Sequence, residues 1–285
     1  MLSLTISLTT DYSRELLVEQ ELEQLAGARV VEQALQVLFA IAQGDQPQGV
    51  RGFAEHLGIS KSTLQRILGT LQKSGLVRLD PVKQTYAFTS KSLILSASYQ
   101  RDLDLVSMLR PSMEAMRKLS GETITLSLAV DGYRVTIFQL DSAHDLRLTT
   151  KLGKRYPLVV GATGRALLGS MTEVDRRDAI SLYAETGVEL ATGEIIHIDP
   201  EEVDRRAREA HDLGYAASYG EWSPGGVGLS IPIPFSAPGG EVAALSIYGV
   251  QTRLSRERAE ELIPELKRVS TSLAKAAADV REATA

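Results

Sequence analysis

Apolar residues in the first third of the chain recur every three or four positions, the spacing of a helix that packs one face on a core. This spacing holds over residues 29–41, 50–57 and 60–74. Glycine or proline follows each segment, and the third begins with Ser60, a residue type that caps helices. The pattern therefore predicts three short helices, with the third capped by Ser60.

After the third helix the pattern changes to short runs typical of strands. The segments "LVRLD" (76–80) and "TYAF" (85–88) flank the turn "PVKQ", which carries Lys83 and Gln84. Three helices followed by such a hairpin make a winged helix-turn-helix, which we expect over residues 27–90.

Two interpretations fit the polar face of the third predicted helix: a solvated surface, as on most helices, or a surface that enters the major groove of DNA. At 100° per residue, the side chains that point away from the apolar stripe are those of Ser62, Arg66, Gly69 and Lys73, with Thr63 and Gln65 on its flanks. No acidic residue occurs from Ser60 to Leu79, where phosphate would repel one. Together with the basic hairpin, this absence favours DNA.

Side-chain chemistry assigns roles to the candidate DNA contacts, because Arg and Gln match base edges whereas Lys and hydroxyls bind phosphate. The candidates are Arg51, Lys61, Ser62, Thr63, Gln65, Arg66, Lys83 and Gln84. We expect Arg66 and Gln65 to contact base edges, and Ser62 and Thr63 to contact bases or phosphate. Lys61, Arg51 and Lys83 are expected to bind the DNA backbone.

The charge distribution removes an objection to a DNA partner. The net charge is −5, but residues 45–95 hold seven Lys or Arg against three acidic residues, a local charge of +4. Residues 1–26 hold one basic and five acidic residues, so we expect an acidic N-terminal extension there. Physiological salt screens charges beyond about 8–10 Å, and the local balance is therefore the one that DNA meets.

A mostly helical segment is predicted over residues 91–119. Its apolar residues at three- or four-residue steps are Leu95, Tyr99, Leu103, Val106, Leu109, Met113 and Met116. Pro111 is expected to start a new turn or to kink the helix. Such a stripe is more typical of core or dimer packing than of a cofactor site, so we expect a linker and dimerisation helix.

Beyond Gly121 strands and helices follow each other. "ETITLSLAV" and "YRVTIFQL" flank Asp131-Gly132, the strongest hairpin signal in the chain. The later predicted helices are "TGRALLGSM", "EVDRRDAISLYAET", "PEEVDRRAREAHDLG" and a last one from about Ser255, and the later strands are "YAASY", "VGLSIPI" and "EVAALSIYGV". This order predicts an α+β domain over residues 120–285, an antiparallel sheet flanked by helices.

Composition excludes several kinds of chemistry. The chain has no cysteine, and its four histidines, His56, His144, His197 and His211, match no zinc-binding spacing. No GxSxG elbow, Walker loop or dinucleotide fingerprint occurs. We therefore expect no metal, no cofactor and no enzymatic activity.

No apolar run reaches the roughly 18 residues of a membrane span, and the N-terminus lacks the basic region of a secretory leader, so a cytoplasmic protein is expected.

With these residues in view, the chain resembles the IclR-type transcriptional regulators from about Gly27 to Val280. The resemblance is carried by "GISKSTLQRILGTLQKSGLV", "LRPSMEAMRKLSGETITLSLA", "YPLVVGATGRALLG", "GYAASYGE" and "GEVAALSIYG", in the family's order. It implies a winged helix-turn-helix, a linker helix and a GAF-like domain that binds a small organic or aromatic acid. It also implies a homodimer or tetramer that binds a double-stranded DNA operator.

Family effectors bind where the start of the "GRALLG" helix faces the last two strands. Carried onto this chain, that implies Gly161, Ala162, Tyr219, Glu221, Ser246 and Tyr248. The chain departs from the family where a usual "PLHATA" reads "PLVVGATG", and where Tyr248 replaces a commonly small residue. These departures concern the identity of the ligand.

Helix electrostatics point to the same place. The first amides of a helix lack partners and favour an anion, so the helix preceded by residues 161–164 suits a carboxylate. Thr163 is included in the candidate site, although capping of the helix by Thr163 with nothing bound is an equal alternative. Tyr248, Trp222 and Phe138 are candidates for an apolar lining, with burial in the core as the alternative for Phe138.

The sequence thus predicts a ligand-responsive, DNA-binding regulator that is not an enzyme. Two alternatives remain at this point: an enzyme with a winged-helix appendage, and a module that uses its winged helix to bind a protein.

Overall fold

The computed structural model describes residues 28–44, 49–103, 105–236 and 242–284. The chain divides into two compact units between Ala97 and Ser98. The predicted acidic extension, residues 1–26, lies outside the described residues.

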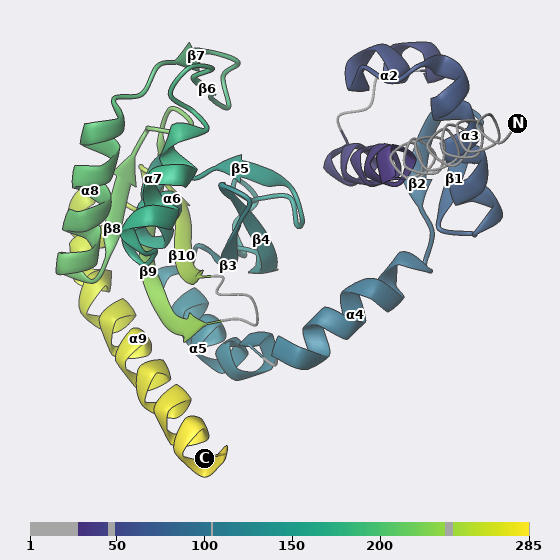
Figure 1. Ribbon diagram of the computed structural model, residues 1–285. Coiled ribbons are helices and arrows are strands. Elements are labelled where there is room, and N and C mark those ends of the chain that lie inside the picture. Colours follow the sequence, from purple (N-terminus) through teal and green to yellow (C-terminus); the bar gives the residue numbers. More distant parts are fainter. Residues whose placement is uncertain (1–27, 45–48, 104, 237–241, 285) are drawn as a thin grey trace, which may run out of the picture. The chain divides into compact units, whose positions relative to one another are not determined.

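The N-terminal unit is a winged helix-turn-helix. It contains a helix over residues 28–43, then α2 (Gly49–Leu57), α3 (Lys61–Lys73), β1 (Val77–Asp80) and β2 (Thr85–Phe88) (Figure 1). The two strands pair antiparallel, with Val77 opposite Phe88 and Asp80 opposite Thr85. The apolar faces of the three helices meet in one core, in which Val37, Phe53 and Leu64 are almost completely buried. Val31 and Leu35 of the stripe predicted for the first helix are instead largely exposed. Because the apolar face of α3 packs in this core, its opposite, polar face is exposed to solvent.

The predicted cap of α3 is confirmed. The Ser60 hydroxyl accepts a hydrogen bond from the amide of Thr63 at 3.2 Å. The cap satisfies one of the four amides that a helix leaves unpaired at its start.

Replacing Ser60 with alanine is expected to lower the free energy of unfolding of the N-terminal unit by about 1 kcal/mol, the usual cost of losing such a cap. Urea denaturation followed by circular dichroism measures the change. Ser96→Ala is the control, because Ser96 is an exposed helical serine that makes no side-chain hydrogen bond among the described residues. Equal stability of the two variants would contradict this role of the cap.

The segment predicted as one linker forms two helices, α4 (Ser92–Leu103) and α5 (Leu105–Ser120). In α4, Leu95 is 68% exposed, whereas Leu109, Met113 and Met116 in α5 are fully buried in the C-terminal unit. The apolar residues that form one stripe in the sequence are therefore exposed at Leu95 in α4 and buried in α5. Pro111 lies inside α5 and does not end it, because the buried face of the helix offsets the lost amide hydrogen bond.

The C-terminal unit is built on one antiparallel sheet of six strands, in the order β5-β4-β3-β10-β9-β8. The strands are β3 (Thr123–Val130), β4 (Tyr133–Leu140), β5 (Arg155–Pro157), β8 (Ala216–Tyr219), β9 (Gly226–Ser236) and β10 (Val242–Val250). The predicted hairpin at Asp131-Gly132 joins β3 to β4, and both turn residues have positive φ, 49° and 78°, as the favoured two-residue hairpin turn requires. Thus the α+β prediction is confirmed, with β5 as a strand that the sequence pattern missed.

The remaining helices are α6 (Gly161–Gly169), α7 (Glu173–Ser181), α8 (Pro200–Leu213) and α9 (Arg256–Thr284). A small hairpin of β6 (Val188–Glu189) and β7 (Ile195–Ile196), also absent from the sequence prediction, precedes α8. Asp199 caps α8, and Gly214 ends it in the left-handed conformation at φ 70°. No helix in the described part of the chain is long and apolar enough to cross a membrane.

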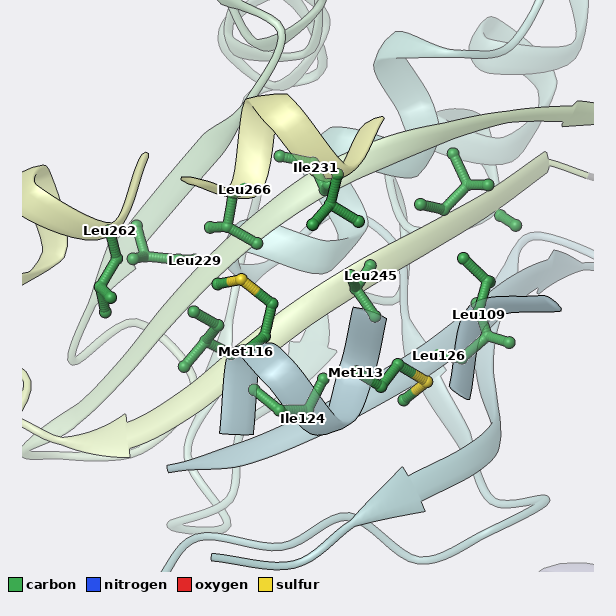
Figure 2. Close-up of a cluster of buried hydrophobic side chains, with 14 of the residues drawn as sticks. Leu109, Met113, Met116, Ile124, Leu126, Leu229, Ile231, Leu245, Leu262 and Leu266 are labelled. Carbon is green, nitrogen blue, oxygen red and sulfur yellow. The ribbon is translucent and has the colours of Figure 1, made fainter. Parts of the chain in front are cut away.

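The two faces of the sheet differ in chemistry. On one face α5 and α9 pack against β3, β9 and β10, and the contact is aliphatic, with Met113, Leu126 and Leu245 among the buried side chains (Figure 2). The other face is covered by α6, with α8 packed beside α6 (Figure 1). Strand alternation sends the hydroxyl-bearing residues to this second face, which holds the candidate effector site.

Candidate DNA-binding surface and effector site

The outer face of α3 is exposed and carries no acid. Lys61, Ser62, Gln65 and Arg66 are exposed, and Thr63 is half-buried. The side chains of Gln65 and Arg66 have no partner among the described residues. Their amide and guanidinium groups are therefore available to an outside partner.

The two hydroxyls at the start of α3 are partly engaged within the chain. The Ser62 hydroxyl lies 3.1 Å from that of Ser60, and the Thr63 hydroxyl lies 2.8 Å from it. A hydroxyl both donates and accepts, so these contacts leave each side chain capacity for one more hydrogen bond. Arg51 differs from Arg66, because its guanidinium pairs with Glu55 at 3.0 Å on the exposed surface of α2.

The tip of the wing is held by its own side chains. The Asp80 carboxylate accepts the amides of Val82 and Lys83 at 2.9 and 3.0 Å, and these backbone hydrogen bonds lower the pKa of Asp80. Gln84 has a φ of 53°, and its side-chain amide donates to the Pro81 carbonyl at 2.8 Å. Lys83 is exposed. Gln84 is thus engaged in the turn, whereas Lys83 presents a cation at its tip.

In the C-terminal unit, hydroxyls gather on the face of the sheet that α6 covers. Neighbouring strands place Thr125 opposite Ser246, and Ser246 opposite Ser230. All three are fully buried. The Ser246 hydroxyl lies 2.8 Å from that of Ser230 and 2.8 Å from that of Thr163 on α6. Thr125 Oγ1 is the one buried side-chain polar atom in the described residues that has no hydrogen-bond partner.

Thr163 does not cap α6. Val160 occupies the cap position without a side-chain hydrogen bond, and the Thr163 hydroxyl reaches Ser246 and, at 2.9 Å, the Tyr248 hydroxyl. The backbone amides of Ala162 and Thr163 are buried and have no acceptor among the described residues. Of the two alternatives left by the sequence, the structure therefore has uncapped, unpaired amides at the start of α6.

The first amide of α6 is already engaged with an anion from the chain itself. The Glu221 carboxylate accepts a hydrogen bond from the Gly161 amide at 3.3 Å and forms a salt bridge with Arg165. Gly161 has a φ of 83°, a conformation that glycine adopts without strain. Glu221 is thus at the predicted place, but it occupies the first helix amide itself.

A cavity of about 370 Å³ adjoins this end of α6. Its apolar lining comes from Val159, Val160, Ile196, Ile198 and Val203, and its charged or polar lining from Arg165, His197, Asp199, Glu202, Arg206 and Glu221. Glu221 and Arg165 therefore belong both to the wall of the cavity and to the hydrogen-bonded group at the start of α6.

Two predicted side chains are not brought to this group. Tyr219 packs on the α5 and α9 face of the sheet, where the Arg256 guanidinium lies 4.3 Å from its ring centre, and burial raises the pKa of its phenol. Phe138 lies on the same face, with the Arg110 guanidinium 4.5 Å from its ring centre. The neighbouring Ser218 faces α6 in place of Tyr219.

The sequence prediction missed Arg134 and Tyr156, which the fold brings from β4 and β5 to the predicted Trp222 and Tyr248. Arg134 on β4 is 5% exposed and donates to the Tyr248 hydroxyl at 3.0 Å. The Tyr156 and Trp222 rings meet edge to face with centres 5.6 Å apart, and the Arg134 guanidinium lies 5.5 and 5.8 Å from them. No spacing signal connects these residues, because β4, β5 and the segment after β8 are far apart in the chain. No group of acidic and histidine side chains in the described residues has the arrangement of a metal site.

Comparison with protein families gives two matches. Residues 30–81 match the IclR helix-turn-helix domain, and residues 97–275 match the bacterial transcriptional regulator IclR C-terminal domain. The chain is 27% identical over 251 residues to the HTH-type transcriptional repressor AllR of Escherichia coli (strain K12), covering 87% of this chain and 91% of AllR. It is 28% identical over 219 residues to the HTH-type transcriptional regulator KdgR of the same strain, covering 76% and 81%.

Solved structures show the same fold. A putative IclR transcriptional regulator from Silicibacter sp. TM1040 superposes with a TM-score of 0.72 at 21% identity, over 86% of this chain and 95% of that one. An IclR homologue from Microbacterium hydrocarbonoxydans, complexed with 4-hydroxybenzoate, superposes with a TM-score of 0.66 at 18% identity, over 86% and 98%.

Proposed function

The chain belongs to the IclR family of bacterial transcriptional regulators, and from that premise we propose that it binds pseudo-palindromic operators through α3 and the wing under the control of a small organic or aromatic acid. Its helix-turn-helix domain and its named relatives make it a regulator and not an enzyme. The observation that carries the operator proposal is the acid-free outer face of α3, on which Gln65 and Arg66 are exposed and have no side-chain partner in the described part of the chain.

Chemistry divides the proposed DNA contacts into two kinds. Arg66 and Gln65 match the edges of guanine and adenine in the major groove and would read sequence. Lys61 and Lys83 would bind phosphate and set the position of the unit on the duplex. Arg51 shares its charge with Glu55, so its contribution is smaller than the sequence indicates.

Replacing Lys83 with alanine is expected to weaken binding to all duplexes alike and to lower the slope of log affinity against log salt by about one, because one phosphate contact is lost. Fluorescence anisotropy at several salt concentrations measures the slope. The control is Lys154→Ala, which removes a cation from the C-terminal unit and should leave the slope as in the original chain. An unchanged slope for Lys83→Ala would remove the wing from the interface.

The protein is proposed to bind DNA as a dimer of two copies of the chain. On the helix over residues 28–43, Val31, Leu35 and Phe39 follow each other at four-residue steps and are 61%, 49% and 51% exposed. Leu93, Ile94 and Leu95 in α4 are also largely exposed. A pairing of such apolar surfaces about a two-fold axis would place two α3 helices at symmetric half-sites.

The effector is proposed to bind at the start of α6. The unpaired, buried amides of Ala162 and Thr163 suit a carboxylate, and the adjoining cavity offers an apolar wall to the rest of a small acid. The bound 4-hydroxybenzoate of the Microbacterium hydrocarbonoxydans homologue supports an aromatic acid as one member of the ligand class.

A ligand changes operator affinity only if it binds the two conformations of the protein with different affinity. The test is the operator affinity of the full chain with and without a saturating acid found by thermal shift, where a ligand at 100 times its Kd adds about 2.7 kcal/mol to stability. Equal operator affinities with and without a bound acid would contradict the proposed switch.

A further inference from the structure

Arg134 is a buried cation with no carboxylate to neutralise it. Its side chain is in the C-terminal unit at the start of β4, and the residue is 5% exposed. No acidic side chain among the described residues lies within salt-bridge distance of its guanidinium. A charge removed from water at such a position is costly unless it is paired.

Three other arginines of this unit that are at least partly buried form salt bridges with carboxylates. Arg165 pairs with Glu221, and Arg176 pairs with Asp204 at 2.6 Å. Arg253 pairs with the buried Glu122 at 2.6 and 2.9 Å. Each of these three cations has a carboxylate partner, whereas the more deeply buried Arg134 has none among the described residues.

Most hydrogen-bonding capacity of Arg134 is unused. A guanidinium has five N–H donors, and within the described residues Arg134 makes one side-chain hydrogen bond, to the Tyr248 hydroxyl. Among the described residues, Thr125 Oγ1 is the only fully buried side-chain polar atom that has no hydrogen-bond partner. The unpaired nitrogens of Arg134 are therefore not fully buried and keep some contact with solvent.

Aromatic rings surround this guanidinium. Tyr156, Trp222 and Tyr248 are each half-buried, and none of them is a carboxylate. On a further side lies Gly161, where an added Cβ would stand 3.3 Å from the nearest Arg134 nitrogen. The absence of a side chain at Gly161 leaves the guanidinium in contact with the start of α6.

The carboxylate at the start of α6 already has other partners. Glu221 is held by Arg165 and by the Gly161 amide, so the described part of the chain leaves Arg134 without an anion. An anionic ligand would therefore neutralise the charge of Arg134, and the surrounding aromatic rings favour a planar ligand.

We propose that Arg134 is the receptor for the anionic group of the effector, and that with Tyr156, Trp222 and Tyr248 it selects planar aromatic carboxylates over neutral analogues. This inference rests on the proposed effector-binding function and names the residue that sets its ligand class. The carboxylate accepts from the guanidinium and from the Tyr248 hydroxyl, while its ring packs among the aromatic side chains.

The test is isothermal titration calorimetry of the full chain with benzoate and 4-hydroxybenzoate, each beside its neutral primary amide. The original chain should bind the acids and not the amides. Arg134→Gln should weaken acid binding by at least about tenfold, and Arg134→Lys by less, because a charged hydrogen-bonding partner is lost or replaced. Arg177→Gln, an exposed arginine on α7, should bind as the original chain does. Absence of acid binding by the original chain, or equal binding by Arg134→Gln, would overturn the inference.

Thermal unfolding without ligand separates a receptor from a scaffold residue. Arg134→Gln should lower Tm less than Arg176→Gln does, because the loss of its contacts with Tyr248 and the aromatic rings is offset by removal of a buried charge without a carboxylate partner. Arg176→Gln removes the more buried of the two arginine partners of Asp204 and leaves it only the exposed Arg208, so this variant should lower Tm. An equal drop in both variants would show that Arg134 is structural. If the acids bind through Arg134 but operator affinity stays the same, the proposed switch fails and the assignment of Arg134 stands.

Discussion

Replacing Gly164 with alanine is expected to destabilise the C-terminal unit by at least the roughly 1–3 kcal/mol typical of an overpacked core. Gly164 lies in α6, where it packs against the backbone that precedes the helix. A Cβ at this position would overlap the carbonyl oxygen of Leu158 and lie 2.7 Å from its carbonyl carbon. Backbone atoms do not rotate away as a side chain does, so α6 and the segment that precedes it must move apart.

The effect of Gly164→Ala should extend to ligand binding, because α6 carries the Ala162 and Thr163 amides. Urea denaturation and the thermal shift produced by an aromatic acid measure the two effects. Gly69→Ala in α3 is the matched control: a Cβ at Gly69 meets no atom within 4 Å, and alanine in a helix adds about 0.5–1 kcal/mol of stability. A Gly164→Ala chain as stable as the original would contradict the close packing of α6.

Replacing Arg66 with alanine is expected to weaken operator binding by about 1–3 kcal/mol and to relax the preference at one base pair of each half-site. Arg66 is exposed on α3 and has no ion pair among the described residues, so its loss has no compensating change within the protein. Competition binding with operators mutated one base pair at a time measures both effects.

Two further variants show whether the effect is specific. Arg177→Ala removes an exposed arginine from the C-terminal unit and should bind the operator as the original chain does. Lys83→Ala should weaken all sequences alike, whereas Arg66→Ala should weaken the preferred sequences most. The same loss on every duplex for Arg66→Ala would make it a phosphate contact and not a base contact.

Local patterns were sufficient to predict the N-terminal unit. The three apolar stripes, the cap at Ser60 and the short wing are encoded within a few residues of one another, so spacing alone indicates them. The hairpin at Asp131-Gly132 was predictable for the same reason. The two-residue strands β6 and β7 and the three-residue β5 were missed, because strands of this length are too short to show an alternating pattern.

The sequence predicts a candidate effector site at the start of α6, but it does not predict which side chains meet there. The alternation along β8 sends Ser218 toward α6 and Tyr219 toward the aliphatic core, and the sequence does not reveal which side of the strand faces the helix. The sequence did not single out Arg134, because what distinguishes this arginine is the absence of a carboxylate partner in the folded unit. A basic residue without a nearby carboxylate becomes visible only when the strands that surround it are assembled.

The central claim is that the outer face of α3 reads DNA sequence. The most direct measurement is selection of duplexes from a random library by the full chain and by Arg66→Ala, followed by sequencing. The account predicts that the original chain enriches an inverted repeat and that Arg66→Ala loses the preference at one symmetric pair of positions. Failure of the original chain to enrich any sequence, or an identical motif from both chains, would contradict it.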